Sequence, residues 1–231
     1  MICQVKLVAV TQGAGFLEGK SAEDIISYAA RVSSPQNQSN FETAPRLLAY
    51  CLREKHFSIF ETSSMTLEIT TSRAIADQLL RHRSATFQQH SQRYSPSTTF
   101  VKCPARRQDG KNRQNSIPDM SEADQQWFSD SQQQVWDLSH SLYQEALRRG
   151  IAKECARNIL PLGVQTTLFM TMNVRSWIHY IELRTGNGTQ QEHKDIAETA
   201  KAIFVKEFPN IAAALDWTCV SENNAERVVT Q

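Results

Sequence analysis

The stretch at residues 81–94, RHRSATFQQHSQRY, most limits how this chain can fold, because it gathers arginines, histidines, hydroxyls and amides into one short segment. The run before it, residues 72–80, repeats apolar residues at i and i+4 and predicts an amphipathic helix that begins near Ser72. Arg81, His82 and Arg83 would then lie in the last turn of that helix. One explanation is that these cations only complement the helix dipole, which is worth up to about 1 kcal/mol.

The continuation of this stretch favours a ligand instead. Residues 88–93, QQHSQR, add hydrogen-bond donors and acceptors but show no helical apolar stripe. Guanidinium groups match phosphate and carboxylate oxygens, because each can donate two parallel hydrogen bonds and keeps its charge at any working pH. The segment therefore predicts an anion-binding site.

Overall composition indicates one globular unit without a general attraction for polyanions. The chain has 231 residues, enough for one compact domain with a substantial core. Lys and Arg number 25 against 24 Asp and Glu, so nucleic acid and acidic membranes are not expected partners and a small anion is favoured. We expect a single domain over residues 1–220 and a polar, disordered tail at 221–231.

The cysteines indicate a reducing compartment. Cys3, Cys51, Cys103, Cys155 and Cys219 are scattered and form no C-x-x-C pair, so neither a metal site nor a disulfide framework is expected. The first ten residues, MICQVKLVAV, lack the basic and apolar regions of a signal peptide, and no window approaches the length of a membrane span. We therefore expect a cytoplasmic protein.

Hydrophobic periodicity predicts three strands and several helices. Alternating apolar residues mark strands at 5–10, 65–70 and 164–172, and a weaker alternation continues from 94 to 101. Ser21 with Asp24, and Ser121 with Asp124, have the spacing of capped helix starts. Besides the helix after Ser72, helices are expected at residues 21–29, 44–52, 121–149, 152–160, 173–184 and 190–208, with a short packed element at 211–217.

Three further features complete this outline. The glycines at 13, 15 and 19 have the spacing G-x-G-x-x-x-G, and no helix opens at them, so we expect a loop and not a dinucleotide-binding turn. Residues 102–119 are polar and basic and predict a mobile loop, whose cations serve solubility or, alternatively, a lid over an anionic substrate. The helix at 121–149 carries an apolar stripe of Val135, Leu138, Leu142 and Ala146.

The stretch at 81–94 resembles the signature of the flavin-dependent thymidylate synthases, which reads Arg-His-Arg, two residues, Ser, four residues, Ser, one residue, Arg. Thr86 stands where this pattern has Ser and keeps the hydroxyl. Gln89 stands where the family usually has Glu, which removes a charge and adds a donor at a position expected to contact the base. The matching residues are Arg81, His82, Arg83, Thr86, Ser91 and Arg93.

Other segments are similar to motifs of the same family, in the family's order. Residues 56–61 resemble its His-x-(Ser/Thr)-x-Phe-Glu segment, and residues 156–161 its Ala-Arg-x-x-Leu-Pro pattern. Arg157, on a helix of small and apolar residues, needs a structural carboxylate or a ligand anion as a partner. Residues 173–184 resemble the family's element that holds the flavin. Without that resemblance, the helical spacing of Arg175, His179 and Glu182 would indicate only a row of surface salt bridges, which contributes little to stability.

The resemblance implies a fold and a reaction. The fold would be an α+β single domain with a central, mostly antiparallel sheet flanked by helices, specific to the family and without a Rossmann domain. The enzyme would convert dUMP to dTMP, a reductive methyl transfer with methylenetetrahydrofolate as carbon donor and NADPH-reduced flavin adenine dinucleotide (FAD) as hydride source. Members are homotetramers whose active sites draw on several subunits.

The resemblance also assigns residues. Arg184 would be catalytic and polarise the pyrimidine ring, and no cysteine lies in a matched motif to act as a nucleophile. The nucleotide would contact Gln78, Arg81, Gln89, Ser91, Arg93, Arg157 and Arg184. The flavin would contact Ser33, Ser58, Arg81, His82, Arg83, Gln89, Asn173, Arg175 and His179.

Two alternatives belong to other classes. The stretch at 81–94 could bind phosphate or single-stranded nucleic acid, with Phe87 and Tyr94 as stacking platforms. The chain could also be a flavoprotein reductase that makes no nucleotide. Bound flavin would contradict the first alternative, and NADPH oxidation that depends on the pyrimidine nucleotide would contradict the second.

Overall fold

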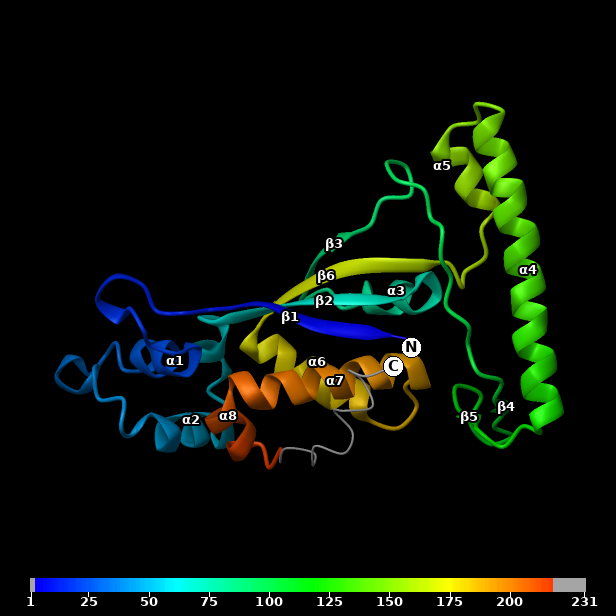
Figure 1. Cartoon of the computed structure of the whole chain (residues 1–231). Coiled ribbons are helices and arrows are strands. Elements are labelled where there is room, and N and C mark those ends of the chain that lie inside the picture. Colours follow the sequence, from blue (N-terminus) through cyan, green and yellow to red (C-terminus); the bar gives the residue numbers. More distant parts are fainter. Residues whose placement is uncertain (1–2, 218–231) are drawn as a thin grey trace.

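A four-stranded antiparallel sheet forms the centre of the molecule in this computed structural model, which describes residues 3–217 (Figure 1). The strand order is β1 (Gln4–Val10), β2 (Ser64–Ser72), β6 (Gln165–Asn173) and β3 (Thr86–Gln89). Strands β2 and β6 pair along their whole length, from Ser64 opposite Asn173 to Ser72 opposite Gln165. The expected antiparallel α+β architecture is confirmed, and the described sheet contains no parallel pair of the dinucleotide-binding type.

The two faces of the sheet differ, as the alternation in the sequence predicts. Met65 and Leu67 on β2 and Met170 on β6 are fully buried on one face. On the other face, the hydroxyls of Thr66 and Thr171 form a hydrogen bond of 2.9 Å between Oγ1 atoms. One face therefore packs against the core and the other is polar and partly exposed.

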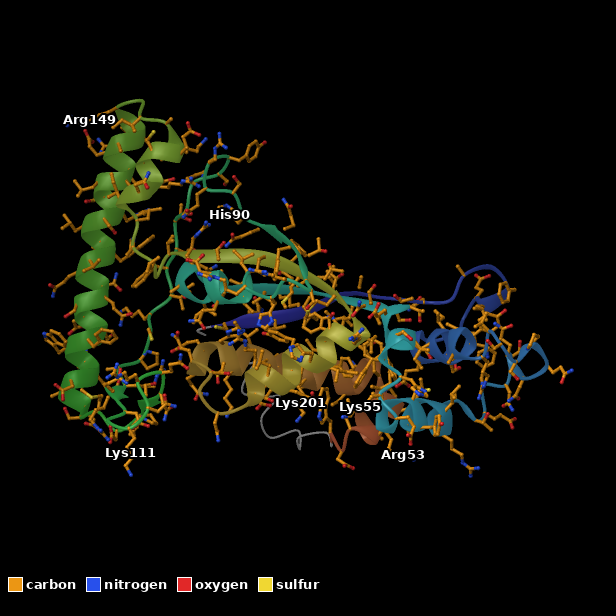
Figure 2. The ribbon with its side chains drawn as sticks, turned by 180° about the vertical axis from the view of Figure 1, so that it is seen from behind. Arg53, Lys55, His90, Lys111, Arg149 and Lys201 are labelled. Carbon is orange, nitrogen blue, oxygen red and sulfur yellow. The ribbon has the colours of Figure 1, made fainter. Side chains whose placement is uncertain are left out.

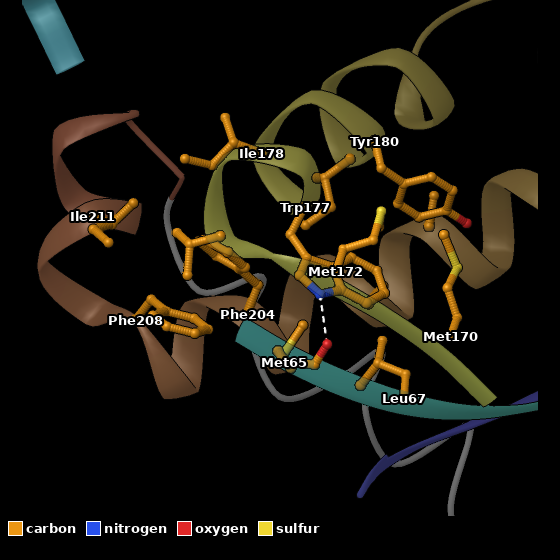
Figure 3. Close-up of a cluster of buried hydrophobic side chains, with 14 of the residues drawn as sticks. Met65, Leu67, Met170, Met172, Trp177, Ile178, Tyr180, Phe204, Phe208 and Ile211 are labelled. Carbon is orange, nitrogen blue, oxygen red and sulfur yellow. Dashed lines mark hydrogen bonds between the residues drawn. The ribbon is translucent and has the colours of Figure 1, made fainter. Parts of the chain in front are cut away.

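Helices cover the apolar face. Figure 1 shows α6 (Val174–Thr185) and α7 (Gln191–Glu207) below the sheet, with α8 (Pro209–Ala214) beside them. Trp177 of α6 is fully buried, and its Nε1 donates a 2.9 Å hydrogen bond to the carbonyl oxygen of Met65 (Figure 3). This bond satisfies the only polar atom of the indole side chain within an apolar core, in which Phe204 and Phe208 are also fully buried.

Apart from α3 (Arg73–Leu79), which lies beside the sheet, the remaining elements lie at the two ends of the molecule (Figure 1). One end holds α1 (Ala22–Ala30), α2 (Ala44–Arg53) and the 3₁₀ turns η1 (Gly15–Leu17), η2 (Pro35–Asn37) and η3 (Phe57–Glu61). The other holds the long helix α4 (Glu122–Arg148), the short α5 (Lys153–Ala156) and η4 (Arg157–Ile159). Lys111, in the hairpin of β4 (Arg107–Gln108) and β5 (Ser116–Ile117), and Arg149 mark opposite ends of α4 in Figure 2.

Polar caps fix several helix starts where the sequence predicts them. The Ser21 hydroxyl accepts a 3.2 Å hydrogen bond from the backbone N–H of Asp24, whose carboxylate accepts from the Ser21 backbone N–H, so α1 has a complete capping box. The Ser121 hydroxyl caps α4 in the same way, by accepting from the Asp124 N–H at 3.1 Å. Ser72 caps α3 (Arg73–Leu79).

The helix α3 ends earlier than the sequence predicts. Its last residue is Leu79, so Arg81, His82 and Arg83 follow the helix and are not part of its last turn. The backbone N–H of His82 donates to the carbonyl oxygen of Leu79 at 3.0 Å, an i to i+3 turn that is tighter than the α-helix. This turn leaves Arg81 and Arg83 exposed and directs His82 inward, where it is buried.

Three other segments differ from the expected secondary structure. The weak alternation at 94–101 forms only an isolated bridge between Phe100 and Val164. The expected helix at 152–160 divides into α5 and η4. The segment at 102–119 is not an irregular loop, because it contains the β4–β5 hairpin, which is closed by an ion pair of 2.6 Å between Arg107 and Asp119.

Most of the apolar stripe on α4 is not covered by residues 3–217. Val135, Leu138 and Leu142 are 55%, 64% and 49% exposed, whereas Ala146 is buried. The face of α4 that packs inward instead carries Trp136, whose ring stacks on Phe100 with a centroid distance of 5.0 Å. The sequence pattern therefore marks an exposed apolar face, not a core face.

Two further expectations from the sequence concern membrane spans and the C-terminal tail. None of the helices within residues 3–217 combines the length and the hydropathy of a membrane span. The polar tail at 221–231 lies outside the described residues.

The carboxylate of Glu23 joins α1 to the start of α8 and gives a first prediction. It accepts a buried 2.8 Å hydrogen bond from the Ile211 N–H and a 2.6 Å bond from Asn210, and burial raises its pKa. Glu23→Ala leaves the Ile211 N–H without a partner, so we expect urea unfolding to show a loss of about 1–3 kcal/mol. Glu23→Gln keeps an oxygen acceptor and should lose little free energy of unfolding. Equal losses in both variants would contradict this role. Glu18→Ala, at an exposed position, serves as the control.

Candidate active site

Arg184 and His82 form the centre of the candidate site. Arg184 lies in the last turn of α6, and its Nε donates a 2.9 Å hydrogen bond to Nε2 of His82, which follows α3. Because Nε2 accepts, the His82 imidazole is neutral and carries its proton on Nδ1. Burial, and secondarily the charge of Arg184, lowers the pKa of His82 to about 4, which agrees with a neutral ring.

A second buried histidine lies behind this pair. His193 of α7 is fully buried, and its ring centroid is 6.0 Å from that of His82 and 5.9 Å from that of Tyr180. Its Nδ1 lies 3.3 Å from Oε1 of Gln78, an atom that can only accept, so Nδ1 carries the proton. Burial first, and then the charge of Arg184, lowers the pKa of His193 to about 3. His193 therefore joins Gln78, His82 and Arg184 into one cluster.

A cavity of about 650 Å³ lies between α6 and η3. Arg175 and His179, one turn apart on α6, contribute positive and hydrogen-bonding groups to its wall. Arg175 pairs across the cavity wall with Glu61 of η3 at 2.5 Å, and not with Glu182 of its own helix. The cavity is lined by Phe57, Glu61, Ser84, Arg175, Ser176, Ile178, His179 and Glu182.

Asn173 has a structural task besides any binding role. Its side-chain oxygen accepts a 2.8 Å hydrogen bond from the Ser176 N–H and caps α6. The cap sets the start of α6 and, through it, the positions of Arg175 and His179.

The edge strand β3 and the loop after it carry a second group of candidate residues. Nε2 of Gln89 donates to Oγ1 of Thr166 at 3.3 Å. Ser91 is exposed, and Arg93 forms an exposed ion pair of 2.8 Å with Glu154 of α5. Arg157 is half-buried in η4, directly after α5, and forms no ion pair within residues 3–217. Arg93 and Arg157 thus lie on neighbouring elements.

The structure brings some predicted site residues together and leaves others apart. Gln78, His82 and Arg184 meet around His193, and Arg175 with His179 lines the cavity. Arg81, Arg83, Ser33 and Ser58 are exposed; Ser33 lies in the turn after α1 and Ser58 in η3, which borders the cavity.

Sequence reasoning missed Tyr180, His193 and the pairing partner Glu61. Tyr180 precedes Arg184 by four residues and so shares its helix face, a signal that was present in the sequence. Its ring meets His82 edge-on at 4.9 Å between centroids. No local pattern distinguishes His193, because its partners come from α3 and α6.

The neutral buried histidines predict an acid-sensitive fold. The unfolded chain binds protons below the ordinary histidine pKa near 6.5, whereas folded His82 and His193 do not until about pH 4 and 3. The free energy of unfolding should therefore fall as the pH drops from about 6.5, by up to about 1.4 kcal/mol per pH unit for each group. In urea unfolding between about pH 6.5 and 4.5, His193→Gln should show a shallower fall than the wild type. The exposed His56→Gln is the control, and an unchanged slope in His193→Gln would count against the assignment.

Comparison with known proteins places this geometry in a family. The model described as thymidylate synthase complementing protein matches residues 16–210. A probable flavin-dependent thymidylate synthase of Paramecium bursaria Chlorella virus 1 is 57% identical over 214 residues, covering 92% of this chain and 98% of the relative. The flavin-dependent thymidylate synthase of Synechocystis is 54% identical and covers 92% of this chain and 99% of the relative.

A solved structure agrees with these relatives. The UMP/dUMP methylase PolB from Streptomyces cacaoi, bound with 5-Br dUMP, matches with a TM-score of 0.79 and 26% identity, over 93% of this chain and 94% of that one. The family motifs read from the sequence, the antiparallel fold and the extent of these matches agree, and the chain belongs to the flavin-dependent thymidylate synthases.

Proposed function

We propose that this protein converts dUMP to dTMP with a methylene group from methylenetetrahydrofolate and a hydride from FAD that NADPH has reduced. The observation that carries the proposal is the setting of Arg184, held through Nε by a neutral imidazole. Its two terminal nitrogens form no hydrogen bond within the described residues and are left to bind a ligand. Such a fork can donate to O2 of uracil and, when the ring takes its N3-deprotonated, anion-like form, to N3 as well.

Arg184 would act by stabilising charge. Substitution at C5 of uracil requires electron density on that carbon, and a cation at the N3 and O2 edge stabilises the anion-like form of the ring that supplies it. A preorganised donor of this kind typically lowers the barrier by about 3 kcal/mol. Arg184 is therefore our candidate for the catalytic residue.

Three of the described cysteines, Cys3, Cys51 and Cys103, are poor candidates for a nucleophile. Burial, as the largest cause, raises the pKa of Cys3 and of Cys103 to about 11 and also raises that of Cys51. A thiol with a raised pKa is protonated at neutral pH and attacks slowly. This supports a reaction without attack by a protein thiolate. The free thiols also support our proposal that the protein works in the reducing cytoplasm.

The cavity on α6 fits part of a flavin dinucleotide. Arg175 and His179 offer donors suited to a diphosphate, and Phe57 offers an apolar surface in the same wall. Reduced flavin, when bound, supplies the hydride. The protein's part is to hold and orient it, for which we propose Ser33, Ser58, Arg81, His82, Arg83, Gln89, Asn173, Arg175 and His179.

We propose that the site is completed by other copies of the chain in a homotetramer. The proposed dUMP ligands are Gln78, Arg81, Gln89, Ser91, Arg93, Arg157 and Arg184. Three of them, Arg81, Ser91 and Arg93, are exposed on the surface, where a second copy of the chain would cover the nucleotide. The apolar face of α4 at Val135, Leu138 and Leu142 is also exposed, and such faces are typical of protein contacts.

Product formation tests the proposal directly. The purified protein is incubated with dUMP, methylenetetrahydrofolate, NADPH and FAD, each is omitted in turn, and dTMP is detected by mass. We expect dTMP only in the complete mixture. NADPH oxidation without dTMP would favour a reductase, and nucleic-acid binding without bound flavin would favour a binding module.

Arg184→Ala should remove turnover and leave the flavin in place. Loss of the guanidinium should lower kcat/KM for dUMP by about 100-fold or more. Flavin content, read from the visible spectrum, should match the wild type, because Arg175 and His179 remain. The exposed Arg53→Ala is the matched control, and loss of flavin in Arg184→Ala would contradict the assignment.

Gln89→Glu should keep or raise activity. The Thr166 hydroxyl, which now accepts from the Gln89 amide, can rotate and donate to a carboxylate instead. The substitution also restores the residue that the family usually carries. Steady-state rates with dUMP measure the effect, and an inactive Gln89→Glu would show that the amide is required.

A further inference from the structure

A chain of hydrogen bonds runs from the β4–β5 hairpin segment to Gln78. Nε2 of Gln78 donates to Oε1 of Gln190 at 2.6 Å, and Nε2 of Gln190 donates to Oε2 of Glu192 at 2.9 Å. Glu192 in turn accepts from Arg106, with ion-pair and hydrogen-bond distances of 2.7 and 2.8 Å. The four side chains come from α3, the turn before α7, α7 itself and the segment just before β4.

The ion pair at the end of this chain is buried. The side chains of Arg106 and Glu192 are 12% and 4% exposed, in contrast to 51% and 46% for Arg107 and Asp119 in the same hairpin. Cys103 also donates to Glu192, at 3.2 Å from Sγ to Oε1. Burial, the largest single cause, opposes ionisation of Glu192, but the hydrogen bonds from Arg106, its own backbone N–H, Gln190 and Cys103 together outweigh it, and the pKa of the carboxyl is lowered. Glu192 is thus a fixed, charged acceptor.

A charged acceptor gives the chain of amides a direction. A carboxylate can only accept, so Gln190 must turn its NH₂ group toward Glu192 and its oxygen toward Gln78. Gln78 must then donate through Nε2 to Gln190 and present Oε1 to the Nδ1–H of His193. Each amide could be flipped without Glu192, since an amide offers a donor and an acceptor of similar shape.

We propose that Glu192, held by Arg106, is a positioning residue that fixes the amide orientation of Gln78 for nucleotide binding. This inference rests on the proposed function, in which Gln78 contacts dUMP. The fixed amide holds its second N–H and its second oxygen lone pair in one arrangement only. Binding of the nucleotide therefore costs no free energy for orienting the Gln78 side chain. The hairpin segment thereby acts on dUMP affinity without touching the nucleotide.

The test compares two carboxylates of the same region. Glu192→Gln replaces the obligatory acceptor by an amide of the same size, and Asp119→Asn does the same to the exposed pair with Arg107. The measurements on the flavin-loaded protein are the Kd of dUMP by calorimetry, KM and kcat for dUMP, and flavin content. We expect Glu192→Gln to raise Kd and KM about tenfold with kcat and flavin content nearly unchanged, and Asp119→Asn to behave as the wild type.

A second variant covers the case in which Glu192→Gln does not fold. Gln190→Ala interrupts the chain but leaves the Arg106–Glu192 pair intact, and the same rise in Kd and KM is expected. An unchanged Kd in a folded Glu192→Gln or Gln190→Ala overturns the inference, as does an equal effect of Asp119→Asn. A wild-type protein that binds no dUMP and makes no dTMP overturns the proposed function itself.

Discussion

The pairing of β2 with β6 is the constraint on which the site depends. Each strand has nine residues, so the paired strands are about 30 Å long, and because they are antiparallel, α3 and α6 start at opposite ends. With seven and 12 residues, the two helices are about 10 and 18 Å long. Two helices that start at opposite ends and run back along the strands can meet with their C-terminal ends, which is where His82 and Arg184 form their hydrogen bond.

The sequence predicted those features of the fold that depend on residues close together in the chain. The alternation of Met65, Leu67 and Ile69 gave the buried face of β2, and Ser21 and Ser121 marked helix starts, because caps and pleats depend on near neighbours in sequence. The family motifs supplied the fold class and the candidate residues, including Gln78, His82 and Arg184.

Long-range contacts decided what the sequence did not predict. The end of α3 at Leu79 follows from a tight turn that places His82 against Tyr180 and His193, and neither partner is near it in sequence. The stripe on α4 has helical spacing, but spacing alone does not say whether an apolar face meets the same chain or remains exposed. The partners of Arg175 and Arg93 are likewise Glu61 and Glu154, each far away along the chain.

Arg184 and Arg106, to which we assign a catalytic and a positioning role, are held by different kinds of partner, and the difference suits these proposed roles. Arg106 pairs with the carboxylate of Glu192, which neutralises it and makes a rigid anchor inside the protein. Arg184 is oriented by the neutral imidazole of His82, which accepts a hydrogen bond without cancelling the positive charge. A carboxylate in the place of His82 would orient Arg184 equally well but would neutralise the charge that, in the proposed reaction, stabilises the uracil ring. Burial is also the main cause of the low pKa of His82, and it keeps the imidazole neutral. The charge of Arg184 therefore remains available to a substrate.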